Sequence, residues 1–362
     1  MKAAFPIASV EPAHSVHLIG GLPTAGVERG FARVRGLLDV FSFAEFVGSS
    51  LGEASPIGVL LPPYLETSQL VEDWEGSSYL PGRLGGDAHI GNVITVVDTD
   101  SFVGQLCSPE PISAHGWGKN AHDSRTVADI TAGQVESATH LLLIGEAHSS
   151  EAVEARLKAL NPTAERVALD EASDDRLREF LSGARVFADH PQPLGSAKMI
   201  PPWLALLQAE PEAPSRSDRF VYRRSCPFDP DRFGEWLMSP PSELVRGKGH
   251  LWLANRCDQS FGYSCAGHVH RVFAAGQWWA TYGGAAWPTC DVARRRLLRR
   301  WHPEFGDRCQ EIAFIGIDLN VADVCSRLDS CLLSYEETLE LISSAMPQAV
   351  ARGTAAPRVG FH

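Results

Sequence analysis

Residues 16–28 read Val16-His17-Leu18-Ile19-Gly20-Gly21-Leu22-Pro23-Thr24-Ala25-Gly26-Val27-Glu28, and the expected arrangement of the first domain follows from them. The apolar run 16–20 predicts a β-strand, and a helix-like stretch follows the loop. Between them, Gly21 and Gly26 are separated by four residues. A strand, a glycine loop of this spacing and a helix form the frame of a phosphate-binding loop.

Two residues that a working phosphate-binding loop needs are missing. The position of the lysine that reaches the terminal phosphate oxygens is Val27, and the position of the Ser or Thr that holds magnesium is Glu28. A carboxylate at this place repels a triphosphate, at a cost of about 1–4 kcal/mol for one contact at about 4 Å. The loop alone is equally compatible with a glycine-rich turn that never bound phosphate.

Outward from this loop, short apolar runs alternate with amphipathic stretches, which is typical of a mainly parallel sheet with crossover helices. The expected helices are 125–137 and 150–160. The expected strands are Val16–Gly20, Ile57–Leu61, Val93–Asp98, His140–Ile144 and Arg166–Leu169. The first domain, residues 1–195, is therefore predicted to be α/β.

A proline-rich linker is predicted at 196–218, because prolines disrupt regular elements, although Trp203–Gln208 has the composition of a short helix. A smaller α+β domain is expected at 219–346 and a flexible tail at 347–362. The expected helices of this domain are 229–238 and 291–301. Its expected strands are Phe220–Arg223, His250–Ala254, Gly267–Phe273, Trp278–Tyr282 and Glu311–Asp318.

The composition of the chain argues against a nucleic-acid-binding, membrane-spanning or disulfide-rich protein. The formal net charge of -12 over 362 residues opposes general nucleic-acid binding, which depends on neutralising phosphates. The sequence shows neither an apolar run long enough to span a bilayer nor the pattern of a secretory signal, so a cytoplasmic location without membrane association is expected. The eight cysteines are scattered, which favours free thiols or metal ligands over a disulfide framework.

One cluster of cysteine and histidine is dense enough to supply several zinc ligands. Its members are Cys257, Cys265, His268 and His270, and the two histidines would share one face of a strand. The spacing is not that of a standard zinc motif. Plain thiols and surface histidines are the alternative interpretation.

The densest basic stretch consists of Arg294, Arg295, Arg296, Arg299 and Arg300. On a helix, arginines four residues apart repel one another weakly, so an anionic partner such as RNA or an acidic protein surface would relieve them. A solvated helix face balanced by nearby carboxylates is the alternative.

The C-terminal half resembles the CobW-type family of nucleotide-binding metal chaperones. The resemblance is carried by four strings in the family's order: 226–233 (CPFDPDRF), 245–254 (VRGKGHLWLA), 305–316 (FGDRCQEIAFIG) and 328–333 (LDSCLL). In the N-terminal half, 93–98 (VITVVD), 125–129 (RTVAD) and 159–164 (ALNPTA) are also similar to family segments. The implied fold is a degenerate P-loop GTPase-like domain followed by a CobW C-terminal domain.

In the register of that resemblance, three functional motifs are lost. The glycine loop falls where the family has its P-loop, and the guanine-reading Asn-Lys-x-Asp tetrad is replaced by Ile144-Gly145-Glu146-Ala147. The family's Cys-x-Cys-Cys metal motif is absent, since no cysteine precedes Cys107. GTP is therefore not expected as a cofactor, no hydrolytic activity is expected, and zinc is the candidate metal.

The resemblance thus implies a non-catalytic adaptor or regulator in zinc homeostasis. An actinobacterial branch of the family implies, as a partner, the ribosome or a ribosome hibernation factor recruited under zinc limitation. The alternative is a zinc or cobalt metallochaperone that still binds GTP through non-standard contacts.

Overall fold

The protein is described here by a computed structural model, in which residues 15–48, 56–65, 67, 70, 89–182, 202–208, 216–282, 287 and 291–345 can be described. The chain divides into two compact units, Met1–Pro201 and Pro202–His362. Most of the predicted linker 196–218 lies outside the described residues, as does the predicted tail 347–362. Helix α9 (Pro202–Gln208) and the start of a strand at Arg216 fall within the linker range.

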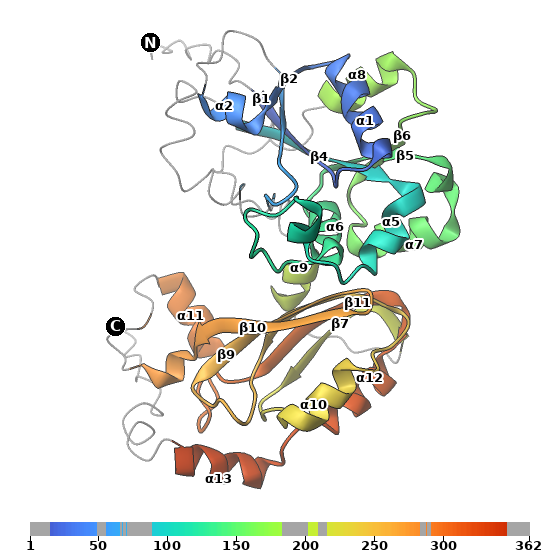
Figure 1. Ribbon diagram of the computed structural model, residues 1–362. Coiled ribbons are helices and arrows are strands. Elements are labelled where there is room, and N and C mark those ends of the chain that lie inside the picture. The colour runs from blue at the N-terminus through green and yellow to red at the C-terminus, as the bar shows by residue number, and fades with distance from the viewer. Residues whose placement is uncertain are drawn as a thin grey trace, which may run out of the picture. The chain divides into compact units, whose positions relative to one another are not determined.

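Unit 1 contains a parallel sheet with the strand order β2-β3-β1-β4-β5-β6 (Figure 1). Every described pairing in it is parallel. The strands are β1 (Ser15–Gly20), β2 (Asp39–Ser42), β3 (Ile57–Leu60), β4 (His89–Asp98), β5 (His140–Ile144) and β6 (Glu165–Ala168). The five predicted strands are confirmed, whereas β2 was not predicted. Only two of its four residues are even partly buried, so it lacks a strong apolar run.

The helices of unit 1 lie on both faces of this sheet. They are α1 (Ala25–Arg35), α2 (Phe43–Gly48), α5 (Thr99–Leu106), α6 (Val127–Glu136), α7 (Glu151–Leu160) and α8 (Asp174–Ser182). One core joins α1 and α8 to Ile19, Ile94 and Leu142. A second core on the opposite face joins α2 to Val16 and Leu18, because successive strand residues point to opposite faces.

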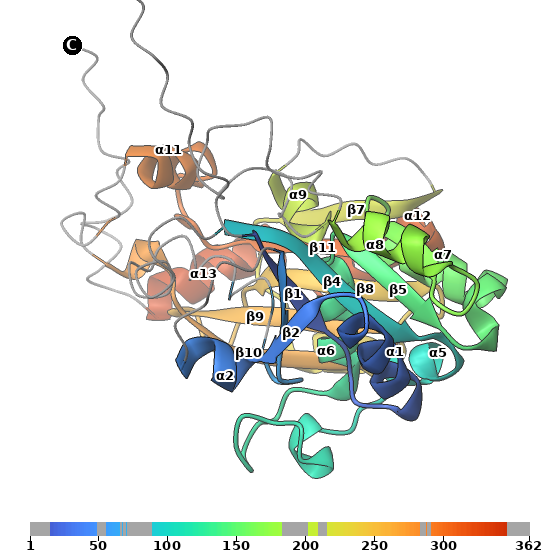
Figure 2. The same ribbon diagram turned by 90° about the horizontal axis from the view of Figure 1, so that it is seen from above.

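The strand order changes direction between β1 and β4, which Figure 2 shows side by side. In open parallel sheets, ligands bind outside the carboxyl ends of the strands at such a switch point. In this unit the switch point brings together the glycine loop after β1 and Asp98 at the end of β4.

Unit 2 contains an antiparallel sheet with the order β10-β9-β8-β11-β7. Its strands are β7 (Arg216–Arg224), β8 (Leu244–Leu251), β9 (Gln259–Ala266), β10 (Val269–Gln277) and β11 (Gln310–Asn320). Helices α10 (Pro230–Leu237) and α12 (Val321–Asp329) pack on one face through an aromatic core that includes Tyr222, Phe228, Phe233 and Phe314. Helices α11 (Asp291–Arg299) and α13 (Tyr335–Ala345) complete the described helices of this unit.

Two of the predicted strands in unit 2 are wrong. The strand expected at 250–254 overlaps β8 only at its last two residues, because β8 spans Leu244–Leu251. The strand expected at 278–282 does not form. Residues 279–281 form the 3-10 helix η4 (Trp279–Thr281), not part of a strand at 278–282. The Asp307 carboxylate accepts hydrogen bonds from the backbone N–H groups of Trp279 (2.9 Å) and Ala280 (2.8 Å). A carboxylate 27 and 28 residues away in the sequence therefore fixes this turn, which local β-propensity does not reveal. Strand β9 was also not predicted.

Candidate nucleotide-binding site

The glycine loop joins β1 to α1, as predicted, and the Thr24 side chain bonds one of the N–H groups at the start of the helix. Thr24 is the N-cap of α1, with φ -123° and ψ 164°, and its Oγ1 accepts a hydrogen bond from the Val27 N–H at 3.1 Å. The same hydroxyl donates to Asp98 Oδ2 at 2.6 Å. A free N–H at the start of a helix is what binds phosphate, and here the chain's own side chain is its partner.

Packing alone accounts for both glycines of the loop. A Cβ atom on Gly26 would lie 2.6 Å from Asp98 Oδ2, and a Cβ on Gly21 would lie 2.8 Å from Val27 Cγ1. The Asp98 carboxylate therefore sits against the N-terminal turn of α1. An anionic group is favourable there because the helix dipole places partial positive charge at that end. The chain supplies this anion itself.

Val27 and Glu28 differ in what they contribute to the structure. Val27 is 2% exposed and packs in the core between α1 and the sheet. Glu28 is exposed in the first turn of α1. The lysine position thus holds a core residue, so a charged side chain could reach solvent there only by disturbing the packing around α1.

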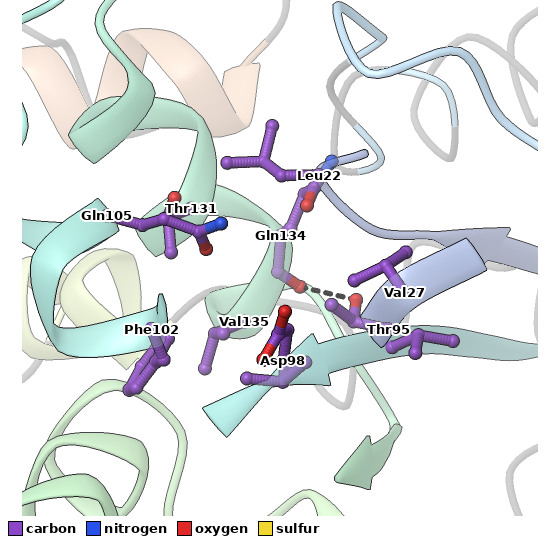
Figure 3. Close-up of a pocket in the computed structure, with 11 residues that line it drawn as sticks. Leu22, Val27, Thr95, Asp98, Phe102, Gln105, Thr131, Gln134 and Val135 are labelled. Atoms are coloured by element: carbon purple, nitrogen blue, oxygen red, sulfur yellow. Dashed lines mark hydrogen bonds between the residues drawn. The ribbon is translucent and has the colours of Figure 1, made fainter. Parts of the chain in front are cut away.

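Beneath the loop lies a small pocket of about 10 Å³, lined by residues of the loop, β4, α5 and α6 (Figure 3). That volume holds about one water molecule. Thr95 Oγ1 donates across this region to the Gln134 carbonyl oxygen at 2.9 Å, which ties β4 to α6. The pocket beneath the loop is therefore far smaller than a nucleotide.

The loop at the position of the guanine-reading tetrad is also closed by internal contacts. Ile144 is buried, Gly145 has φ 110°, and η2 (Glu146–Ser149) follows. Asp100 Oδ1 accepts from the Ala147 N–H at 2.9 Å. A Cβ on Gly145 would lie 2.7 Å from Asp100 Oδ2. The Asp100 carboxylate therefore fixes the backbone of this loop.

His148 adds a second internal contact to this loop. Its Nδ1 lies 2.9 Å from the Gly145 carbonyl oxygen and its Nε2 lies 3.1 Å from Glu171 Oε1. The hydrogen bond to the Gly145 carbonyl, assisted by the negative charge of Glu171, raises the pKa of His148. The site that the sequence located thus contains Thr24, Asp98, Asp100 and His148, none of which the sequence analysis selected as a site residue. The only signal for Asp98 was its place at the end of a buried strand.

The formal charge is concentrated in unit 1. Residues 1–201 contain 14 basic residues (Lys and Arg) and 26 acidic residues (Asp and Glu). Residues 202–362 contain 18 basic and 18 acidic residues. The whole net charge of -12 therefore belongs to unit 1, which contains the parallel sheet and the glycine loop. A field of this sign opposes the approach of a triphosphate, most strongly at low ionic strength.

The predicted zinc cluster does not assemble in the structure. Cys257 packs beside Trp252 in one core, whereas Cys265 belongs to the core under α10 and α12. His270 lies opposite Cys265 in the strand register, but its Nδ1 is 2.8 Å from the Tyr263 hydroxyl. Burial, assisted by the charge of His268, lowers the pKa of His270 to about 4. Within the described parts of the chain, no three His, Cys, Asp or Glu residues are arranged to hold a metal ion.

Another cysteine–histidine contact was not predicted. Cys309 Sγ lies 3.5 Å from His250 Nε2, and the same nitrogen is 3.8 Å from Glu311 Oε2. Burial raises the pKa of the Cys309 thiol to about 12, so it remains protonated. Two arginines also donate to the Glu311 carboxylate, as described next. Among the described residues, this pair is not part of a group of three or more residues that could hold a metal ion.

The arginines of the predicted basic patch have different environments. Arg294, Arg295 and Arg299 are exposed, whereas the side chain of Arg296 is outside the described set. Arg300 lies just beyond α11 and donates to the buried Glu311 and to the Leu207 carbonyl oxygen. Arg223 of β7 donates to the same two acceptors, at 2.8 and 2.7 Å. Arg300 therefore stabilises unit 2 through its contacts with Glu311 and α9.

Comparison with known proteins places these observations in a family. Residues 217–332 match the model of the cobalamin synthesis protein cobW C-terminal domain. The zinc chaperone Rv0106 of Mycobacterium tuberculosis is 30% identical over 295 residues, which cover 78% of this chain and 67% of that protein. The zinc-regulated GTPase metalloprotein activator 1 of Dictyostelium discoideum is 26% identical over 262 residues, or 69% and 53% of the two chains.

Among solved structures, the Zn(II)-bound YjiA GTPase of E. coli aligns over 89% of this chain and 99% of its own, at 14% identity. The TM-score is 0.33, which is too low to support a structural argument. No described helix is both long and apolar enough to cross a membrane. The matched C-terminal domain, together with the two-thirds coverage of a relative at 30% identity, shows that this chain belongs to the CobW family.

Proposed function

We propose that this chain is a non-catalytic CobW-family protein of zinc homeostasis, which acts by binding a macromolecular partner without using GTP. The observation that carries the proposal is the hydrogen bonding of the glycine loop. Thr24 satisfies the Val27 N–H and Asp98 places a carboxylate at the start of α1. Val27 and Glu28 supply neither a phosphate-binding cation nor a hydroxyl ligand for magnesium.

Zinc homeostasis is supported by the relatives. One is named a zinc chaperone and another a zinc-regulated GTPase metalloprotein activator. Zinc would accordingly be a signal or a cargo handled with partners, because the described residues offer no assembled ligand set for a resident ion.

As the partner we propose the ribosome or a ribosome hibernation factor, engaged under zinc limitation. The contact would use the exposed Arg294, Arg295 and Arg299 of α11. Guanidinium groups bind phosphate and carboxylate in a bidentate manner, and they give a local attraction that the acidic chain as a whole lacks. Unit 2 carries no net formal charge, so this patch is not opposed by its own unit.

Ribosome co-sedimentation tests this proposal, with purified chain and ribosomes from zinc-limited cells, with and without GTP and magnesium. Binding should be independent of GTP and should weaken as salt is raised. The variant Arg295→Glu/Arg299→Glu should lose most of the binding. A matched control, Arg176→Glu/Arg178→Glu on the exposed face of α8, should retain it. Equal binding by both variants, or binding that requires GTP, would rule out this interface.

The second candidate function is a zinc or cobalt metallochaperone that binds GTP through non-standard contacts. The names of the relatives favour it. A transfer assay separates the two functions: the chain is preloaded with zinc and mixed with an apo-metalloprotein and a colorimetric chelator. GTP-stimulated zinc transfer supports the chaperone and counts against the adaptor.

A further inference from the structure

We propose that the outer edge of β10 pairs with β10 of a second copy of this chain, so that two unit 2 sheets join across a two-fold axis. Strand β10 is the last strand of the sheet and pairs with β9 on its inner side (Figure 2). Among the described residues no strand pairs with its outer side. An open edge presents backbone N–H and C=O groups that can extend the sheet.

The edge is long, apolar and accessible. Residues 272–277 are all exposed, with Val272 at 37% and Phe273 at 45%. The strand contains no Asp, Glu, Lys or Pro, which are among the residues that commonly protect edges. A bulge between Ala274 and Gly276 shifts the register, so regular pairing extends over about Val269–Ala274.

The sequence of this segment is complementary to itself. A two-fold axis at Val272 sets Arg271 of each copy opposite Phe273 of the other, on the same face of the joined sheet. Arg271 already lies 5.7 Å from the centre of the Phe273 ring within one chain, and a guanidinium is attracted to an aromatic face. No like charges oppose one another in this register, and unit 2 has no net formal charge to resist association. A single pair of strands buries little surface, so the dimer should be weak.

Sedimentation velocity of the full chain over a concentration series tests the pairing, with two variants of Phe273. Phe273→Lys places a lysine opposite Arg271 of the second copy and should abolish self-association. Phe273→Glu removes the same ring but places a carboxylate opposite Arg271, so it should keep a salt-sensitive dimer where Phe273→Lys shows none. The double variant Arg271→Glu/Phe273→Lys should restore association. Circular dichroism confirms that each variant is folded.

A wild-type chain that stays monomeric at all concentrations would overturn the proposal. Equal self-association of the lysine and glutamate variants would do the same, because it would place the dimer interface elsewhere. The test does not depend on zinc, GTP or a ribosome, so its outcome is independent of the proposed function.

Discussion

At the scale of single residues, the degenerate loop is a structural element with its own internal partners. Thr24 is the N-cap of α1, and its hydroxyl makes two hydrogen bonds. The hydroxyl accepts from the Val27 N–H and donates to the Asp98 carboxylate. The Thr24 side chain thus supplies, from the chain itself, a hydrogen-bond partner for an N–H group at the start of α1.

The variant Thr24→Ala should therefore lower the free energy of unfolding by about 1 kcal/mol, through loss of the helix cap and of the contact with Asp98. Thr24→Ser keeps the hydroxyl and should remain close to wild type. Urea unfolding of both variants measures the difference. If the alanine variant is as stable as the serine variant, the hydroxyl does not hold this loop.

His148 gives a prediction for pH. Its folded pKa lies above the ordinary value of about 6.5, because the Gly145 carbonyl and Glu171 favour the protonated ring. Its contribution to stability is therefore complete below pH of about 6.5 and is lost as the pH rises through the folded pKa. An NMR titration should show the raised pKa, and Glu171→Gln should lower it. A pKa that does not respond to Glu171→Gln would contradict the assigned contact.

At the scale of elements, the buried carboxylate of Glu311 connects β11 to β7, α9 and the end of α11. Arg223 and Arg300 both donate to Glu311 and to the Leu207 carbonyl oxygen of α9. A charge-assisted pair with a buried carboxylate is costly to break, because the remaining group is left without its partner.

Arg300→Gln should accordingly destabilise unit 2 by roughly 1–2 kcal/mol, a value reduced because Arg300 is about one-third exposed and Arg223 still pairs with Glu311. Arg299→Gln, one position earlier and exposed, should change stability little. Thermal unfolding compares the two variants, and proteolysis should cleave near α9 faster in Arg300→Gln. Equal stability of the two variants would show that the arginine pair is not structural.

The sequence allowed much of the element order to be predicted, because buried strands such as β5 are continuous apolar runs and α10 begins with an Asp N-cap followed by Pro. Prediction from the sequence failed where a residue distant in the chain determines the local structure. Asp307 accepts the hydrogen bonds that fix the 3-10 helix Trp279–Thr281. Glu311 accepts a hydrogen bond from Arg300, which therefore contributes to packing within unit 2. The proximity of Thr24 to Asp98, 74 residues apart, follows from the sheet order and not from either local motif.

At the scale of the whole molecule, the two units differ in charge and in chemistry. Unit 1 keeps a nucleotide-type sheet but carries the full charge of -12, whereas unit 2 is balanced and presents α11 and the edge of β10. Charge and loop chemistry in unit 1 thus agree with each other: both oppose a bound triphosphate. Both interfaces that we propose, on α11 and on β10, lie in unit 2.

The most direct test of the central claim is isothermal titration of the full chain with GTP in the presence of magnesium. We predict no saturable heat at low or moderate salt, because Val27 and Glu28 supply no cation or magnesium ligand and Asp98 already occupies the start of α1. Saturable binding of one GTP per chain, with an affinity in the micromolar range or tighter, would contradict the account.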